Sequence, residues 1–371
     1  MNPEDPSKKT CSCGSTGATS CGTSTPEPVV PEAPTCSCGP AAPRPVQEIR
    51  PATSTITFAD KFDHFKARWG VRRMNHLVEP GLYRLGNPTR DSPVVVTANY
   101  TLSFDAVRSS LTGTDAYILV LDTKGINVWC AAGKGTFGTG ELLRRIAVTG
   151  LASVVRHRIL VLPQLGAPGV AAHEIQKYSG FWVQYGPVRA RDLPEYLATR
   201  KATPAMRRVE FPLRDRIILT PVELVTLGLP TIIAAIILYF LAGPAAALAA
   251  VAAVLAGTVL FPLLLPYIPT KDFSTRGFLL GLLVAIPFAG TFAGNPTVPG
   301  YANIIAALVP LLVMPVVTAY LALNFTGSTT FTSRTGVKKE IFKYIPVMVL
   351  LGGAGLILGI ALGMARLLGV I

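Results

Sequence analysis

The chain has 371 residues, half of them hydrophobic, and a net charge of +13 from 34 Lys and Arg against 21 Asp and Glu. This length exceeds one small domain. The basic residues gather in the middle of the chain and in short loops between apolar runs, and aromatic residues do not interleave with them. The charge therefore favours a membrane protein that faces the cytoplasm, and nucleic acid is excluded as a partner.

Residues 1–55 are rich in Pro, Ser, Thr and Gly and are predicted to be a disordered tail. The chain starts without an apolar leader, which predicts a reducing cytoplasm where thiols persist. Cys-Ser-Cys pairs in the tail could hold a soft ion such as Hg(II), and incidental thiols are the alternative. The spacing is not that of a ferredoxin cluster. The cysteines of these pairs are Cys11, Cys13, Cys36 and Cys38.

Residues 56–215 alternate between predicted strands and helices. The four strands are expected at 93–97, 116–122, 158–162 and 181–185. Ser103 is expected to cap the helix after the first of them. Strands separated by helices predict an α/β domain with a largely parallel sheet, whose ligand lies at the carboxyl ends of the strands.

The stretch from Asn127 to Lys134 reads Asn-Val-Trp-Cys-Ala-Ala-Gly-Lys. Asn127 is a good helix N-cap, which would place Cys130 in the first turn, where backbone N–H groups are unpaired. A thiol there should lose its proton more easily and could bind a soft metal or attack an electrophile. A small buried cysteine beside a core tryptophan is the alternative.

After the basic stretch 200–216 the chain becomes strongly apolar. No charged residue occurs between Glu223 and Lys271 or between Arg276 and Arg334. Gly and Pro break these blocks, and about 20 apolar residues suffice for one span. We therefore predict an all-α transmembrane domain at 216–371 with five helices at about 222–242, 245–268, 277–294, 301–324 and 344–365. The positive-inside rule places the N-terminal domain in the cytoplasm and the C-terminus outside the cytoplasmic membrane.

The octet from Asn127 resembles the cap-helix signature of the membrane-bound corrinoid protein of microbial mercury methylation. The resemblance continues through 135–139, 161–169, 180–187 and 192–194. These outer segments are similar to the corrinoid-binding domain of the large subunit of the corrinoid iron–sulfur protein of acetyl-CoA synthesis. The Trp-Cys pair and the apolar C-terminal half favour the mercury branch.

This resemblance implies a Rossmann-like corrinoid-binding domain at 56–215, with cobalamin or a related corrinoid as cofactor and Cys130 as the lower axial cobalt ligand. It implies a methyltransferase of one-carbon metabolism that passes a methyl group from cobalt to Hg(II), as a carbanion equivalent or by radical transfer. The implied partners are a ferredoxin-like iron–sulfur reductant and a methyltetrahydrofolate-linked methyl donor. An alternative acceptor would make the protein a methyl carrier, and a soft-metal transporter is a third hypothesis.

The remaining candidate corrinoid contacts lie around Cys130 and at expected strand ends or caps. For each, ordinary packing or turn chemistry is the alternative. They are Thr97, Ser103, Asn127, Val128, Trp129, Ala131, Gly133, Lys134, Thr136, Gln164 and Gly186. Between their ends, the five apolar runs lack acids, bases and histidines, which favours anchoring over transport.

Overall fold

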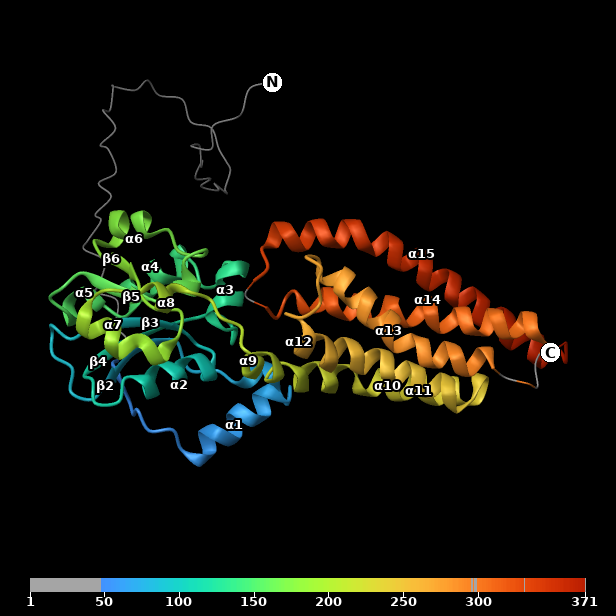
Figure 1. Ribbon diagram of the computed structural model, residues 1–371. Helices are drawn as coiled ribbons and strands as arrows, with labels where there is room; N and C mark the ends of the chain where they lie inside the picture. Colours follow the sequence, from blue (N-terminus) through green and yellow to red (C-terminus); the bar gives the residue numbers. More distant parts are fainter. Residues whose placement is uncertain (1–47, 295, 297–298, 330, 371) are drawn as a thin grey trace, which may run out of the picture. The chain divides into compact units, whose positions relative to one another are not determined.

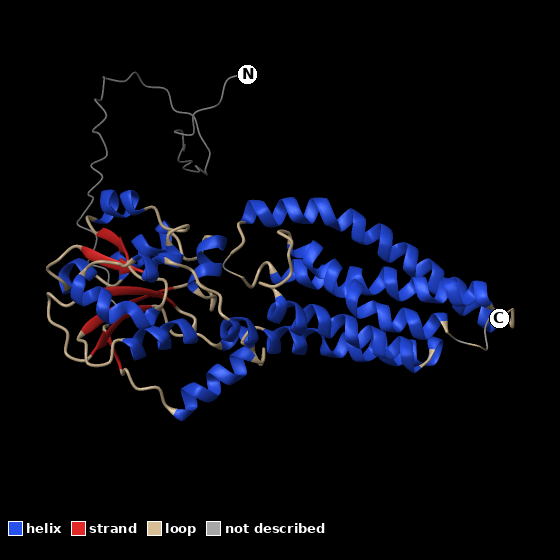
Figure 2. Cartoon of the chain, in the orientation of Figure 1, coloured by secondary structure: helices blue, strands red, loops and turns tan. Residues whose placement is uncertain are grey.

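The computed structural model describes residues 48–294, 296, 299–329 and 331–370. Within these residues an α/β domain precedes a group of long helices (Figures 1 and 2). The tail cysteines expected to bind Hg(II), Cys11, Cys13, Cys36 and Cys38, lie outside the described residues. Arg50–Ala52, which we expected in the tail, form the first strand instead.

The six strands make one sheet in the order β1-β2-β4-β3-β5-β6. All neighbouring pairs are parallel except β2 and β4, which are antiparallel, so the expected largely parallel sheet is confirmed. The strands are β1 Arg50–Ala52, β2 Gly81–Leu85, β3 Val94–Ala98, β4 Ala116–Leu121, β5 Ile159–Leu162 and β6 Trp182–Tyr185.

Helices cover both faces of this sheet, because β3 and β4 are buried along their whole length and offer apolar side chains to each side. One core contains Val94 and Val96 together with residues of α3, α4, α5 and α6. The other contains Val95 together with residues of α2, α7 and α8. The covering helices are α2 Thr101–Ser110, α3 Val128–Lys134, α4 Thr139–Val148, α5 Leu151–Val154, α6 Ala172–Ser179, α7 Leu193–Thr199 and α8 Pro204–Arg207.

The remaining elements of this domain are short or peripheral. A longer helix, α1 Phe58–Arg68, connects β1 to β2 and begins with a capping box in which Thr57 and Asp60 bond reciprocally. Three single turns, η1 Arg73–Asn75, η2 Gln164–Gly166 and η3 Ala190–Asp192, lie in the loops. Helix α9, Leu213–Ile217, leads into the apolar half.

Five helices of the apolar half are long and apolar enough to cross a membrane: Leu213–Ala242, Pro244–Leu264, Phe273–Ala293, Gly300–Phe325 and Thr335–Leu367. Each expected run overlaps one of them. Helix α14 packs against both α13 and α15, with small residues such as Gly277 and Ala319 at close approach. The elements are α10 Thr220–Ala242, α11 Pro244–Leu255, η4 Ala256–Leu260, α12 Phe261–Leu264, α13 Phe273–Ala293, α14 Gly300–Phe325 and α15 Arg334–Leu367.

Candidate functional site

The candidate site lies at the carboxyl edge of the parallel strands, where α3 follows β4. Helix α3 packs against η2, which follows β5, and against β3. Three consecutive strand ends therefore converge on this short helix. In an α/β sheet this edge is where ligands bind.

Helix α3 begins where the sequence predicts. Asn127 is its N-cap, and the side-chain Oδ1 accepts a hydrogen bond of 2.9 Å from the Cys130 amide. Ala131 and Ala132 are buried in the core, and Gly135 ends the helix in the left-handed conformation at φ 85°. The helix is therefore fixed at both ends and along one face.

Cys130 is half-buried, and its thiol is free. Burial raises the pKa of the Cys130 thiol, and the attraction of Lys134, the hydrogen bond with Asn127 and the attraction of Arg73 only partly offset that effect. We expected a thiol that loses its proton more easily, and this expectation is wrong.

Near Cys130, the outer face of α3 is open at Gly133. Gly133 lies one turn after Cys130, and a Cβ added there would meet no atom within 4 Å. On the opposite side the contact is tight: a Cβ on Gly169 would overlap the Phe137 carbonyl oxygen and lie 3.0 Å from the Ala132 Cα. A flat ligand could thus approach the thiol over Gly133, while the inner face is pressed onto the loop after β5.

A buried amide that the sequence analysis missed holds the loop before α3. Asn99, directly after β3, is 3 % exposed. Its Oδ1 accepts hydrogen bonds from the Thr123 amide at 3.0 Å, the Thr123 hydroxyl at 2.8 Å and the Gly125 amide at 3.0 Å. One side chain therefore joins the ends of β3 and β4 and sets the course of the chain into α3.

Three further side chains, also missed, fasten the neighbouring loops. Glu141 in α4 accepts a 3.0 Å hydrogen bond from the Asp122 amide and pairs with Arg145 at 2.6 Å. Thr139 accepts one of 2.9 Å from the Ala171 amide, and the Tyr185 hydroxyl donates one of 2.6 Å to the Val170 carbonyl. A polar residue at a strand end or helix start was the only sequence signal for these roles.

The other expected site residues are divided between the two faces of the sheet. Val128, the first residue of α3, packs against the core that also contains Ala131 and Ala132. The Thr136 amide donates a hydrogen bond to the Ala131 carbonyl. Gln164 in η2 accepts a 2.7 Å hydrogen bond from Arg207, and a Cβ on Gly186 would approach the Val161 side chain at 3.0 Å. Thr136 therefore has its partner in α3, whereas the partner of Gln164 lies in α8 and the neighbour of Gly186 lies in β5.

Thr97 and Ser103 lie on the other face. Side chains alternate along a strand, so Thr97 points to the side of Val95, where α2 packs. Ser103 lies in the first turn of α2 and is not the cap, because the helix already begins at Thr101 after Tyr100. The His76 carbonyl, which accepts a hydrogen bond from the Thr101 amide, fixes that earlier start. The expected cap at Ser103 was wrong.

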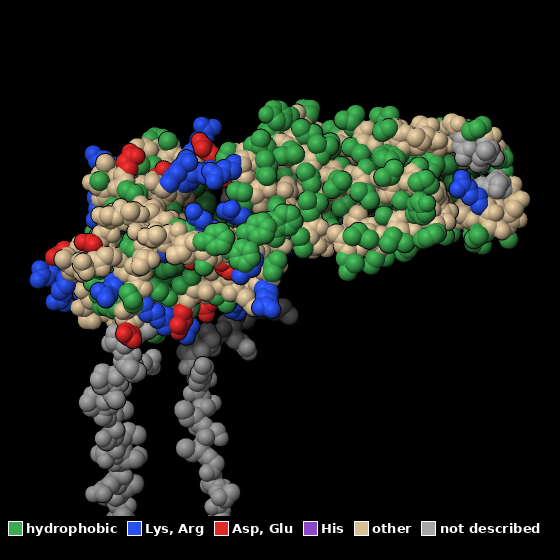
Figure 3. Space-filling model, turned by 90° about the horizontal axis from the view of Figure 1, so that it is seen from below, with side chains coloured by type: hydrophobic (Ala, Val, Ile, Leu, Met, Phe, Trp, Pro, Cys, Tyr) green, Lys and Arg blue, Asp and Glu red, His purple; other side chains and the backbone are tan. Residues whose placement is uncertain are grey.

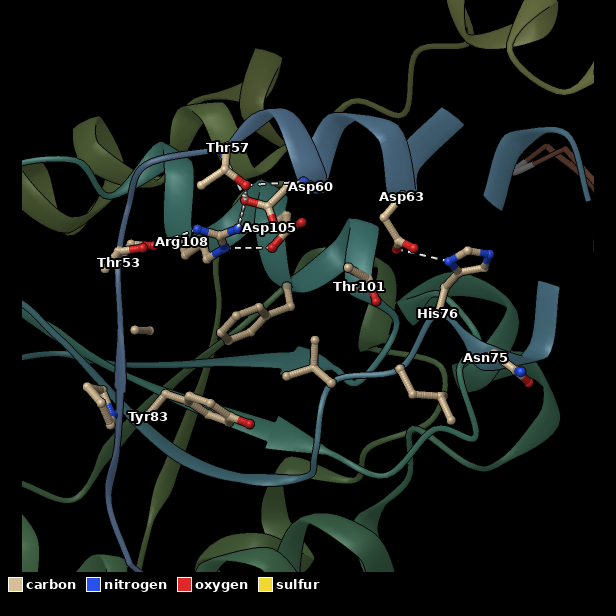
Figure 4. A pocket seen from close by; sticks show the side chains of 15 residues that line it. Thr53, Thr57, Asp60, Asp63, Asn75, His76, Tyr83, Thr101, Asp105 and Arg108 are labelled. Atoms are coloured by element: carbon tan, nitrogen blue, oxygen red, sulfur yellow. Dashed lines mark hydrogen bonds and ion pairs between the residues drawn. The ribbon is translucent and has the colours of Figure 1, made fainter. Parts of the chain in front are cut away.

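The same face carries a separate polar cavity of about 530 Å³ between α1, α2 and β2 (Figure 4). Its polar side chains are bonded to one another: Arg108 bonds to Asp105 at 2.6 Å and to Asp60 at 2.8 Å, and His76 bonds to Asp63 at 2.9 Å. These pairs fasten α1 to the domain. Among the described residues, no group of three or more His, Cys, Asp or Glu side chains is arranged to hold a metal ion.

Comparison with known proteins gives a consistent match over the α/β domain. A family model described as "CO dehydrogenase/acetyl-CoA synthase delta subunit" matches residues 72–197. The acetyl-CoA decarbonylase/synthase complex subunit gamma of Methanopyrus kandleri is 38% identical over 123 residues, which are 32% of this chain and 26% of that protein. The subunit gamma of Methanothermobacter thermautotrophicus is 35% identical over 127 residues, 34% of this chain and 27% of that protein. The chain thus spans about a quarter of the length of these curated relatives.

The names of these relatives contradict the expectation that the chain belongs to the mercury-methylation family. The matching family model describes a subunit of CO dehydrogenase/acetyl-CoA synthase. The curated relatives are subunits of acetyl-CoA decarbonylase/synthase. The expected transfer of methyl to Hg(II) therefore has no support. The second branch of the resemblance, through the outer segments 161–169 and 180–187, agrees with the relatives. The alternative of a methyl carrier fits them better than the methyltransferase acting on mercury.

Proposed function

We propose that the α/β domain binds a corrinoid and carries a methyl group in one-carbon metabolism, on a chain anchored in the cytoplasmic membrane. The observation that carries this proposal is the extent of the family match. Residues 72–197 contain β2 to β6 and every loop at the edge that surrounds α3. The matched segment therefore contains the candidate site and five of the six strands of the sheet.

The residues around α3 fit a corrinoid. The bare surface over Gly133 leaves room for a flat macrocycle, and Cys130 offers the soft thiol suited to cobalt. When bound, the corrinoid supplies a cobalt that accepts and releases the methyl group. In this proposal Cys130 would bind the cobalt, and Lys134, exposed at the end of α3, would contact a polar group of the macrocycle.

The protein's own contribution is to fix the thiol and control its proton. Asn127 and Asn99 hold α3 and the loop before it, so the thiol has one position relative to the sheet. Because burial raises the pKa of the Cys130 thiol, the free group keeps its proton near neutral pH. Binding as a thiolate then releases that proton, so ligation should strengthen as the pH rises.

Membrane anchoring forms the other half of the proposal. The five apolar helices would cross the cytoplasmic membrane with the α/β domain in the cytoplasm and the C-terminus outside. A methyl carrier of this kind needs a methyl donor, such as a methyltetrahydrofolate-linked enzyme, and an iron–sulfur protein as reductant. The acetyl-CoA decarbonylase/synthase names of the relatives support partners of one-carbon metabolism.

The test is the optical spectrum of the full chain in lipid nanodiscs with hydroxocobalamin. A variant in which Cys11, Cys13, Cys21, Cys36 and Cys38 are replaced by Ala retains only Cys130. It should bind cobalamin with a thiolate–cobalt band that grows with rising pH. Adding Cys130→Ala should abolish that band.

Two results would contradict parts of this proposal. If neither variant binds cobalamin, the corrinoid function is wrong. If both bind it with identical spectra, the corrinoid stays but Cys130 is not its ligand.

A further inference from the structure

Helix α1 has its polar face turned inward. Asp60, Asp63, His64 and Ala67 are spaced along one side of the helix, and this side faces α2 and the loop before β2. Asp60 pairs with Arg108, and Asp63 pairs with His76 (Figure 4). His64 bonds to Asp105 at 2.7 Å. Both acidic side chains of the helix are thus held by the domain.

The opposite face of α1 is aromatic and uncovered. Phe58 is 83% exposed, Phe62 and Phe65 are each 54% exposed, and Trp69 is 40% exposed. The spacing of four, three and four residues puts these rings in one stripe, and the rings of Phe65 and Trp69 lie 5.6 Å apart. Val71, Met74 and Leu77 extend the stripe past the helix and are also exposed. We call these seven residues the aromatic surface.

Basic side chains border the aromatic surface. Lys61, Arg68, Arg72 and Arg73 are exposed, and the Lys66 ammonium lies 5.3 Å from the centre of the Phe62 ring. Seen from the side on which α1 lies, hydrophobic side chains gather among Lys and Arg (Figure 3). Lys66 also pairs with Asp63 at 3.5 Å, so the uncompensated positive charge on the outer side of α1 comes from Lys61 and Arg68.

This arrangement is typical of a helix lying in a membrane interface. Such helices place Phe and Trp in the headgroup–acyl boundary and Lys or Arg among the headgroups. In water, by contrast, a stripe of this kind exposes apolar area without compensation. The described residues of the same chain also contain five helices long and apolar enough to cross a membrane.

We propose that the aromatic surface lies in the cytoplasmic phospholipid interface of the membrane that the five helices cross, with anionic headgroups held by Lys61, Arg68 and Arg72. This inference rests on the membrane anchoring proposed above. It gives the α/β domain a second attachment besides the chain connection at α9. The attachment reaches the candidate site, because a Cβ on Gly125, in the loop before α3, would lie 2.5 Å from the Leu77 side chain.

The experiment uses the full chain in nanodiscs that hold one copy each and contain anionic phospholipid. The fluorescence of Trp69 is obtained as the difference between the wild type and Trp69→Phe. Phospholipids brominated on the upper acyl chain should quench most of this component, and aqueous iodide should leave it unchanged. Trp182 on β6, 58% exposed, is the matched control, and the component lost in Trp182→Phe should behave in the opposite way.

Two outcomes would overturn the proposal in different ways. If protease digestion shows the five helices inserted while iodide quenches Trp69 and brominated lipid does not, the surface faces water or another protein, and the interfacial position alone is wrong. If the helices are not inserted, both the membrane anchoring and the interfacial position are wrong.

A second experiment tests the role of the anionic headgroups. In discs of zwitterionic lipid, or with Lys61→Gln and Arg68→Gln, quenching by brominated lipid should fall, and unchanged quenching would contradict that role. The cobalamin spectrum tests corrinoid binding separately, so failure of the interfacial position can be distinguished from failure of the proposed corrinoid function.

Discussion

At the scale of single residues, two asparagines determine where the candidate thiol lies. Asn127 caps α3 through the Cys130 amide, and Asn99 accepts three hydrogen bonds from the loop that leads to it. The Asn127 contact spans three residues, whereas Asn99 reaches residues more than twenty positions away. One is local structure and the other is tertiary structure, and both are needed to hold Cys130.

Replacing Asn99 by Ala should loosen the loop before α3. The Thr123 and Gly125 amides would lose their acceptor, whereas the Thr123 hydroxyl keeps the Ile126 carbonyl at 2.7 Å. Each buried donor left unpaired costs about 1–3 kcal/mol. Hydrogen exchange of the full chain should show faster exchange for the Thr123 and Gly125 amides than in the wild type. Asn87→Ala is the control, because its side chain is exposed and only its backbone amide bonds to Asp115. Equal exchange in both variants would show that Asn99 does not hold the loop.

The sequence predicted the residue of the site that acts locally and missed those that act at a distance. Asn127 was recognisable because an N-cap precedes its helix directly. Asn99, Glu141 and Tyr185 were not, since their partners are brought near only by the sheet. The pKa of Cys130 was expected to be lowered, and this expectation was wrong for the same reason. The helix start is visible in the sequence, but the burial that raises the pKa is created by the fold.

At the scale of elements, α3 is held by close contact on one side and left open on the other. Gly169 lets the loop after β5 press against Ala132 and Phe137. Gly133 faces open space. Two glycines near the same helix therefore have opposite roles, one needed for packing and one for access.

Substituting each glycine by Ala should separate these roles. Gly169→Ala forces α3 away from the loop and should speed amide exchange along 128–134. Gly133→Ala introduces no clash and replaces a poor helix former, so it should stabilise α3 by up to about 1 kcal/mol and slow exchange there. Under the proposed function, Gly133→Ala should still weaken cobalamin binding, because the side chain of the new alanine would occupy the surface over which the macrocycle approaches the thiol. Faster exchange in Gly133→Ala would contradict the open face.

The elements themselves were predictable where periodicity is strong. The buried runs of β3 and β4 give continuous apolar stretches, and the helices between strands follow from them. The missed elements are those whose pattern depends on the tertiary setting. β1 has three residues, β2 enters antiparallel, and α1 turns its apolar side outward, so its pattern does not point to the core.

At the scale of the whole molecule, most charges near the ends of the apolar helices lie before α10, α13 and α15, and Arg366 in the last turn of α15 is the exception. Asp272, just before α13, accepts hydrogen bonds from the Tyr344 hydroxyl at 2.6 Å and Lys343 at 2.9 Å near the start of α15. The hydrogen bond from Tyr344, followed by that from Lys343, lowers the pKa of Asp272. The charged starts of two helices far apart in sequence are thus adjacent, as a common cytoplasmic side requires.

This arrangement leads to a definite topology. Lys271 lies in the loop before α13 and Arg276 in the first turn of that helix. Lys338, Lys339 and Lys343 lie near the start of α15, so both helix starts should stay on the cytoplasmic side. A reporter fused after residue 371 should then be outside: alkaline phosphatase active, green fluorescent protein dark. A fusion after residue 212, before the first span, should give the reverse and serves as the control. Fluorescence from the fusion at residue 371 would require an even number of spans, and one of the five apolar helices would then lie outside the bilayer.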